Sequence, residues 1–198
     1  TTQGSFSPYG SNWGNYFDGS SSLSVDYNTA LNCAGDFTWE FWAYKLSSNN
    51  GGVIQYRDAS GGWSSGAYQI QFAGGKLQFT ANGVSGINSD NAFPLNQWVH
   101  AAITRSGTTI TMYINGVAQS TTRTSSTNFN GSGSSAVFRL GKLYDGNNYY
   151  FDGYVSNYRM VNGTSLYNSN FTPPTSPLTA VTNTALLTCQ SNRFIAVS

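Results

Sequence analysis

The stretch Asp36-Phe37-Thr38-Trp39-Glu40-Phe41-Trp42-Ala43-Tyr44 decides the fold of this chain. Side chains of an extended strand point alternately to opposite faces, so large aromatic rings fall on both faces here. One face carries Phe37, Trp39, Phe41 and Ala43, and the other carries Thr38, Glu40, Trp42 and Tyr44. Both faces must be covered in the folded protein. We therefore expect this strand in the middle of a two-sheet sandwich, or lining a groove roofed by loops.

Short alternating segments separated by turn residues continue along the whole chain. The predicted strands cover residues 13–18, 23–26, 36–45, 53–57, 67–73, 76–81, 98–105, 109–114, a segment starting at 117, 137–143, 150–161 and 185–189. The pair Asn115-Gly116 predicts a two-residue hairpin turn of type I′, in which both residues have positive φ. No segment shows a helical period. This pattern indicates an all-β fold, an antiparallel sandwich or barrel.

Two segments are predicted to lie outside the sheets. Residues 120–135 are rich in Ser, Thr, Asn and Gly, which is typical of a long surface loop. The run Thr-Pro-Pro-Thr-Ser-Pro at 172–177 excludes a central strand, because proline lacks the N–H that a sheet ladder needs. We expect it to cross the molecule and deliver the last strand.

The composition limits the class of function. The chain has 198 residues, the size of one sandwich domain, and its aromatic content of 15% argues against disorder. Charged residues make up 9% and the net charge is +1 with no basic run, which argues against a nucleic-acid partner. No apolar stretch reaches the ~20 residues of a membrane span. Because the sequence lacks an initiator Met and a signal-like segment, we expect residues 1–198 to be one domain of a longer protein.

The two cysteines, Cys33 and Cys189, leave two alternatives open. A disulfide would close a very long loop and would stabilise the fold by about 4–5 kcal/mol in the chain-entropy model. The alternative is two buried thiols that pack as small apolar side chains. Neither cysteine lies in a metal-binding spacing such as C-x-x-C.

Several blocks resemble one family. They are FTWEFW at 37–42, QWVHAAITRSGTTITMYINGV at 97–117 and LGKLYDGNNYYFDGYVSNYRMVNGTSLY at 140–167. In this order they resemble the laminin G-like branch of the concanavalin A-like lectin/glucanase superfamily. The tail at 170–193 is similar to modules of phage tail-fibre and virion proteins, notably those of cyanophages, and of bacterial surface proteins. The resemblance implies a jelly roll of two antiparallel sheets that binds ligands on its concave face or its loop rim.

Enzymatic glycoside hydrolysis is disfavoured by the residues. It requires two carboxylates about 5–9 Å apart. Glu40 is the single glutamate of the sequence and has no acidic neighbour two positions away. His100 is the single histidine, and the sequence nominates neither a nucleophile nor an orienting acid for it. We therefore expect no catalytic residues and structural roles for Glu40 and His100.

Calcium is the one cofactor for which the sequence offers ligands. The loop Asp145-Gly146-Asn147-Asn148 supplies hard oxygen atoms, and laminin G-like domains often hold calcium at one rim. Asp152 and Asp58 could add to Asp145. The alternative is an ordinary turn, for which the same residue types are typical.

Aromatic residues on loops give the better binding signal. Trp63 lies in a polar, glycine-rich loop, while Tyr144 and Tyr149 flank the loop at 145–148. Sugars stack their C–H faces on aromatic rings and use polar side chains to fix their hydroxyls. The predicted glycan-binding residues are Arg57, Trp63, Tyr68, Tyr144, Asn147 and Tyr149. The alternative for Trp63 is a plug that folds down over a sheet.

These observations predict a module that binds glycans on a cell surface and does not catalyse. We expect it on a virion tail or fibre, or at an extracellular surface, next to other domains or subunits of a larger protein. The main alternative is a structural spacer without a specific ligand. A glycoside hydrolase is the third, and the glutamate count argues against it.

Overall fold

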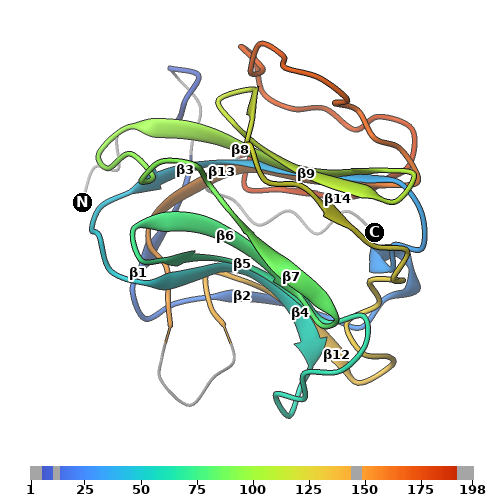
Figure 1. Cartoon of the computed structure of the whole chain (residues 1–198). Helices are drawn as coiled ribbons and strands as arrows, with labels where there is room; N and C mark the ends of the chain where they lie inside the picture. Colours follow the sequence, from blue (N-terminus) through green and yellow to red (C-terminus); the bar gives the residue numbers. More distant parts are fainter. Residues whose placement is uncertain (1–5, 11–13, 144–148, 191–198) are drawn as a thin grey trace.

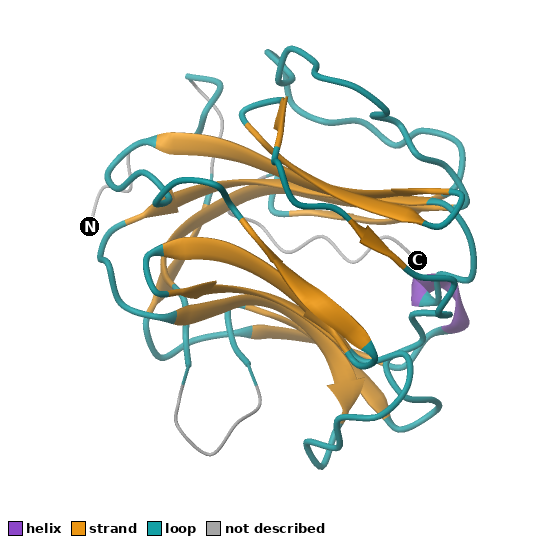
Figure 2. Cartoon of the chain, in the orientation of Figure 1, coloured by secondary structure: helices purple, strands orange, loops and turns teal. Residues whose placement is uncertain are grey.

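Two stacked antiparallel sheets form the molecule (Figure 1, Figure 2). The computed structural model describes residues 6–10, 14–143 and 149–190. Within these residues the helical structure is the single 3-10 turn η1 (Thr29–Leu31). No helix in this part of the chain is long and apolar enough to cross a membrane. The predicted all-β jelly-roll sandwich is confirmed.

Within the described part of the chain, the larger sheet has eight strands. They are β1 (Asn15–Asp18), β3 (Phe37–Lys45), β8 (Trp98–Ser106), β9 (Thr109–Ile114), β10 (Val117–Ala118), β11 (Arg123–Thr124), β13 (Asp152–Asn162) and β14 (Thr184–Thr188). Their order is β1-β13-β3-β8-β9-β10, with β11 also beside β9 and β14 beside β13. The strand β3 thus pairs with β13 and β8, and both of its faces are largely buried. This confirms the central position expected from its sequence.

The smaller sheet has six strands among the residues that the structure describes. They are β2 (Leu23–Asp26), β4 (Gly51–Asp58), β5 (Tyr68–Ala73), β6 (Lys76–Ala81), β7 (Val84–Asn88) and β12 (Ala136–Leu140), in the order β2-β12-β4-β5-β6-β7. The sequence pattern missed β7, because Gly86 interrupts its short alternation at the edge of the sheet. The strand β12 ends three residues earlier than predicted, since Gly141 turns the chain with φ of 87°.

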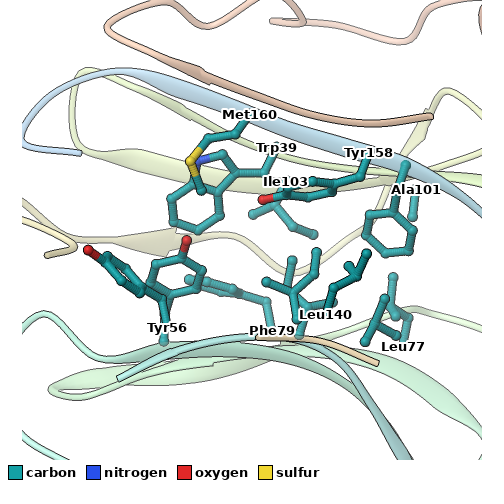
Figure 3. Close-up of a cluster of buried hydrophobic side chains, with 14 of the residues drawn as sticks. Trp39, Tyr56, Leu77, Phe79, Ala101, Ile103, Leu140, Tyr158 and Met160 are labelled. Carbon is teal, nitrogen blue, oxygen red and sulfur yellow. The ribbon is translucent and has the colours of Figure 1, made fainter. Parts of the chain in front are cut away.

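The core lies between the sheets. The Trp39 ring stacks on Phe37 and on Tyr68, with ring centroids 4.0 and 4.2 Å apart. Figure 3 shows Trp39, Ile103 and Met160 from the larger sheet facing Tyr56, Phe79 and Leu77 from the smaller one. Offset stacking of large rings adds to the stabilisation that burial itself provides.

Residues 164–182, called the covering segment here, cover part of the outer face of the larger sheet and are drawn in orange to red in Figure 1. The Thr38 hydroxyl donates to the Thr164 carbonyl and accepts from the Leu166 N–H at 2.8 Å. The Phe171 N–H donates to the Gly116 carbonyl at 2.9 Å. The chain then passes through the proline-rich run to β14, so the predicted crossing segment and last strand are confirmed.

The turn at Asn115-Gly116 has φ of 49° and 75°, as a type I′ hairpin requires. A side chain at Gly116 would also collide with the covering segment, because its Cβ would lie 1.8 Å from the Phe171 carbonyl oxygen. Gly75 makes a matched comparison: it ends a hairpin turn with φ of 77° and has open space around its Cβ position.

We expect Gly75→Val to lower the free energy of unfolding by about 1–2 kcal/mol, the cost of a left-handed β-branched residue. Gly116→Val should cost clearly more, because the main chain at Phe171 must also move. Urea denaturation of both variants measures the difference. Equal losses of unfolding free energy in the two variants would show that the covering segment does not contact this turn closely. An unchanged unfolding free energy in Gly116→Val would contradict the hairpin register at Asn115-Gly116.

The two cysteines are free thiols, and both are buried. The Cys33 thiol donates to the carbonyl oxygens of Gly35 and Asp36. Burial raises the pKa of Cys33 to about 11 and that of Cys189 to about 12. Of the two alternatives, the structure therefore has the buried thiols.

Candidate functional site

Trp63 lies over Arg57 at one end of the smaller sheet. The guanidinium carbon of Arg57 is 5.6 Å from the centroid of the Trp63 ring, within the range of a cation–π contact. Arg57 points away from the core because its neighbour Tyr56 points into it. The Trp63 side chain keeps 37% of its surface exposed. Trp63 is thus no buried plug, and it presents a ring at the edge of the sheet's outer face.

The loop that carries Trp63 is fixed by hydrogen bonds within it and to neighbouring segments. The Asp58 carboxylate accepts from the Ser60 N–H at 2.8 Å and from the hydroxyls of Ser60 and Ser135. These hydrogen bonds, led by that of Ser135, lower the pKa of Asp58 to about 2. The Asn82 amide donates to the Trp63 carbonyl at 3.0 Å. A ring held in this way needs little ordering when a ligand arrives.

Amide side chains fill the outer face beside it. They alternate with core residues such as Ile70 and Phe79. Their set, called the amide face here, consists of Gln69, Gln71, Gln78 and Asn88, which are partly or fully exposed, and Gln55, which is completely buried and is not accessible to a ligand. Gln71 donates to Gln78 at 2.6 Å and Gln78 donates to Asn88 at 2.8 Å. An amide group offers two donors and two lone pairs, so such a chain retains capacity for a ligand.

The geometry suits an elongated polar ligand. Gln55 on β4 donates to Gln69 on β5 at 3.3 Å, so the amides follow one another across neighbouring strands. Strands lie about 4.8 Å apart, so the face from Arg57 on β4 to Asn88 on β7 extends for about 14 Å. Trp63 stands at the Asp58 end of this face. The arrangement combines an aromatic ring with amide side chains that can form hydrogen bonds with hydroxyl groups, a combination that suits sugars.

The structure brings Arg57 and Trp63 together, as the sequence predicted for this site. The prediction for Tyr68 is wrong: its side chain is fully buried and stacks on Trp39. The physical reason is strand parity, since Tyr68 shares the inward face of β5 with Ile70 and Phe72. A glycan on the surface cannot contact it.

Tyr149 lies far from Trp63. Its carbonyl accepts from the Gly52 N–H at 3.2 Å, so Tyr149 is at the Gly51 end of β4, while Trp63 follows the Asp58 end. At about 3.3 Å per residue these ends are roughly 23 Å apart. The prediction that Trp63 and Tyr149 share one binding rim is therefore wrong. Tyr144 and Asn147 lie outside the described residues.

The proposed calcium ligands are separated in the same way. Asp152 pairs with Asp18 at the start of β13 and its carbonyl accepts from Leu46, near the Gly51 end of β4. Asp58 is at the opposite end. Calcium ligands lie 2.3–2.6 Å from the ion, so one ion cannot bind both carboxylates. Among the described residues no cluster of three His, Cys, Asp or Glu side chains occurs. Asp145 lies outside them, and calcium at Asp145 and Asp152 stays a prediction.

Glu40 is completely buried and fully engaged. One carboxylate oxygen accepts from Nε and Nη2 of Arg159 at 2.9 and 2.5 Å. The other contacts Nε2 of His100 at 3.0 Å and accepts from the Tyr167 hydroxyl at 2.9 Å. Burial by itself would raise the pKa of Glu40, but the hydrogen bonds and charges of His100 and Arg159 outweigh it and hold this pKa below its usual range.

This cluster, called the Glu40 cluster here, consists of Glu40, His100, Arg159 and Tyr167. It fastens the covering segment to the sheet, since Tyr167 belongs to that segment and Arg159 also donates to the Thr179 carbonyl at 2.9 Å. Both Glu40 and His100 have 0% exposed side chains. One signal in the sequence could have indicated this cluster. Glu40 falls on the outward face of its predicted strand, and the only histidine, His100, lies on another predicted strand.

The two stacked antiparallel sheets place the protein in the class of concanavalin A-like β-sandwiches. Residues 17–166 match the laminin G family of the concanavalin A-like lectin/glucanases superfamily. This match covers most of the chain, and the chain belongs to that family. No curated protein sequence matches it.

Solved structures share the fold at low sequence identity. A putative carbohydrate binding protein from Bacteroides ovatus has a TM-score of 0.64 and 15% identity over 89% of this chain and 50% of that one. Domains LG4-5 of the mouse laminin alpha1 chain give 0.56 and 20% over 74% of this chain and 40% of that one. Domain 4 of AbnA, a GH43 extracellular arabinanase from Geobacillus stearothermophilus in complex with arabinotriose, gives 0.53 and 18% over 74% and 69%. The chain thus spans half or less of the first two proteins.

Proposed function

We propose that this chain is a non-catalytic module that binds glycans through Trp63, Arg57 and the amide face. The observation that carries the proposal is the exposed Trp63 ring, held over Arg57 at the end of a row of amides. The ring would stack on the C–H face of one sugar, and the amides would hydrogen-bond hydroxyls of the next. The fold is one that lectins and carbohydrate-binding modules use, and the AbnA domain was solved with an arabinose oligosaccharide.

The Glu40 cluster supports the absence of catalysis. Hydrolysis of a glycosidic bond requires two carboxylates that reach the substrate. The carboxylate of Glu40 is buried beneath the covering segment and accepts hydrogen bonds from Arg159 and Tyr167. A proton donor or nucleophile in that position has no access to a bound sugar.

We expect Trp63→Ala to weaken glycan binding about fivefold, the lower end of the ~1–3 kcal/mol per ring lost from aromatic stacking platforms. The melting temperature should change little, because the ring is partly exposed and its loop is fixed by Asp58. Tyr16→Ala is the matched control, since Tyr16 is also an exposed aromatic, at 49%, but lies on the other sheet. A glycan array identifies the ligand and calorimetry measures its affinity.

Three results would contradict the proposal. No glycan bound by the wild type, with or without calcium, together with a large loss of stability in Trp63→Ala, would favour the structural spacer. Equal losses of binding in Trp63→Ala and Tyr16→Ala would place the site elsewhere. New reducing ends released from a bound polysaccharide would make the protein a hydrolase.

We also propose that the module acts outside the cell, on a virion tail or fibre or on a bacterial surface protein. The support is the resemblance of the tail sequence at 170–193 to such modules. Residues 1–198 would then form one domain beside other domains or subunits of the larger protein. Labelled protein that binds intact bacteria and loses this binding after periodate oxidation of surface sugars would support this location.

A further inference from the structure

We propose that the larger sheet carries a second glycan site, on the opposite side of the molecule from Trp63. The site is a groove of about 250 Å³ on the outer face of β8 and β9. Its lining, called the hydroxyl groove here, consists of Thr104, Ser106, Thr109, Thr111, Tyr113, Tyr167 and Asn168. It does not depend on the proposed function of the amide face.

Strand parity builds the floor of the groove. Ile110 and Met112 point into the core, so Thr109, Thr111 and Tyr113 point outward. On the neighbouring strand Ile103 points inward and Thr104 outward, and Thr104 pairs with Thr111 in the register. Ser106 pairs with Thr109 in the same way. Hydroxyl groups from two paired strands therefore lie side by side on one face.

The covering segment builds the wall. Tyr167 stacks on Phe171 with ring centroids 3.6 Å apart and planes inclined by 6°, and its hydroxyl donates to Glu40. The Tyr113 hydroxyl donates to the Tyr167 carbonyl at 3.3 Å. Asn168 accepts from Ser165 at 2.8 Å. The wall is thus held in place before any ligand arrives, which reduces the entropic cost of binding.

The chemistry of the groove selects a neutral ligand rich in hydroxyls. None of the lining residues is charged, so an ionic group would lose hydration without gaining a partner. A wholly apolar ligand would instead cover the hydroxyls of Thr111 and Ser106 without pairing them. Thr104 and Tyr113 are only 2% exposed, so a neutral sugar would exchange hydrogen bonds with Ser106, Thr109 and Thr111 and place its C–H face against Tyr167. The volume is smaller than the ~300–1,000 Å³ of drug-sized sites, so we expect one sugar unit.

The two sites face opposite directions, because each lies on the outer face of its own sheet. Stacked sheets are about 10 Å apart, and the core fills the space between them. One short glycan cannot reach both sites. The module would therefore bind two glycan chains at once, which raises the avidity for a dense surface well above that of either site.

The test uses NMR of protein labelled in the threonine methyl groups. The probes are methyl β-glucoside, methyl β-galactoside and N-acetylglucosamine, with methyl β-glucuronide as the charged counterpart. We expect at least one neutral probe to shift the methyl resonances of Thr104 and Thr111, in the wild type and equally in Trp63→Ala. The double variant Thr109→Val and Thr111→Val should weaken this binding at least about fivefold, the cost of one or two neutral hydrogen bonds.

Valine has the shape and strand preference of threonine, so the double variant should fold, and its melting curve checks this. Thr122→Val, in an exposed loop, is the matched control. Absence of any shift with the neutral probes would overturn the second site. Stronger binding of the glucuronide would overturn its ligand class. Loss of the shifts in Trp63→Ala would show one site rather than two. If the groove shifts persist and calorimetry shows that Trp63→Ala loses no glycan affinity, the proposed amide-face site is refuted and the groove is not.

Discussion

Arg159→Met is expected to lower the free energy of unfolding by about 3–5 kcal/mol, because it leaves the Glu40 carboxylate buried without its charge partner. The carboxylate would retain only the hydrogen bonds from His100 and Tyr167. Methionine replaces the unbranched apolar stem of arginine but not its guanidinium, so the packing around the stem is kept while the contacts with Glu40 and the Thr179 carbonyl are lost. Guanidinium denaturation followed by tryptophan fluorescence measures the loss.

Two comparisons isolate the charge from the packing. Arg123→Met removes an arginine that donates to the carbonyl oxygens of Ser85 and Thr122, and it should cost much less. Adding Glu40→Leu to Arg159→Met removes both charges and should recover part of the loss. If Arg159→Met were as mild as Arg123→Met, the Glu40 cluster would not hold the covering segment.

The same cluster sets a pH dependence. The pKa of Glu40 is lower in the folded protein than in the unfolded chain, so its stabilising contribution is complete above the unfolded pKa of about 4.3 and disappears as the pH falls through the folded value. Asp18 and Asp58, whose pKa values are lowered to about 2, change stability in the same direction. The wild type should therefore lose stability in acid more steeply than Glu40→Gln does.

Trp39→Ala is expected to cost about 3–5 kcal/mol, the usual penalty for truncating a fully buried tryptophan. The indole fills the space between Phe37 and Tyr68, and its N–H donates to Asn162 at 3.4 Å. Thermal denaturation compares it with Trp63→Ala, which removes the same side chain from an exposed position. Similar losses in the two variants would contradict the assignment of one tryptophan to the core and the other to the surface.

The variants Arg159→Met and Trp39→Ala test the surroundings of two neighbouring residues of β3, Glu40 and Trp39. The alternation of the sequence correctly predicted that β3 is covered on both faces. It did not identify the cover on the Glu40 side. That cover comes from residues 164–182, more than a hundred positions later in the chain.

At the candidate site, too, the sequence predicted one feature correctly and others wrongly. The glycine-rich setting of Trp63 correctly indicated an exposed ring, because no apolar pattern surrounds it. The grouping of Trp63 with Tyr149 was wrong, since sequence separation does not reveal that the two lie at opposite ends of β4. Tyr68 was misjudged because the exposed loop residue Ser65 and the inward strand position of Tyr68 are only three residues apart.

The sequence by itself determined the local features of this protein. Alternation of side chains predicted most strands, and Asn115-Gly116 predicted a turn with positive φ, because both depend on the geometry of a few consecutive residues. The tertiary structure decided everything that depends on pairing between distant strands. It placed four residues from positions 40 to 167 in the Glu40 cluster, aligned the amides of four strands in one face, and set Thr104 beside Thr111. Strand register and strand order determine which distant residues come into contact. Both depend on how the whole core packs rather than on any single segment.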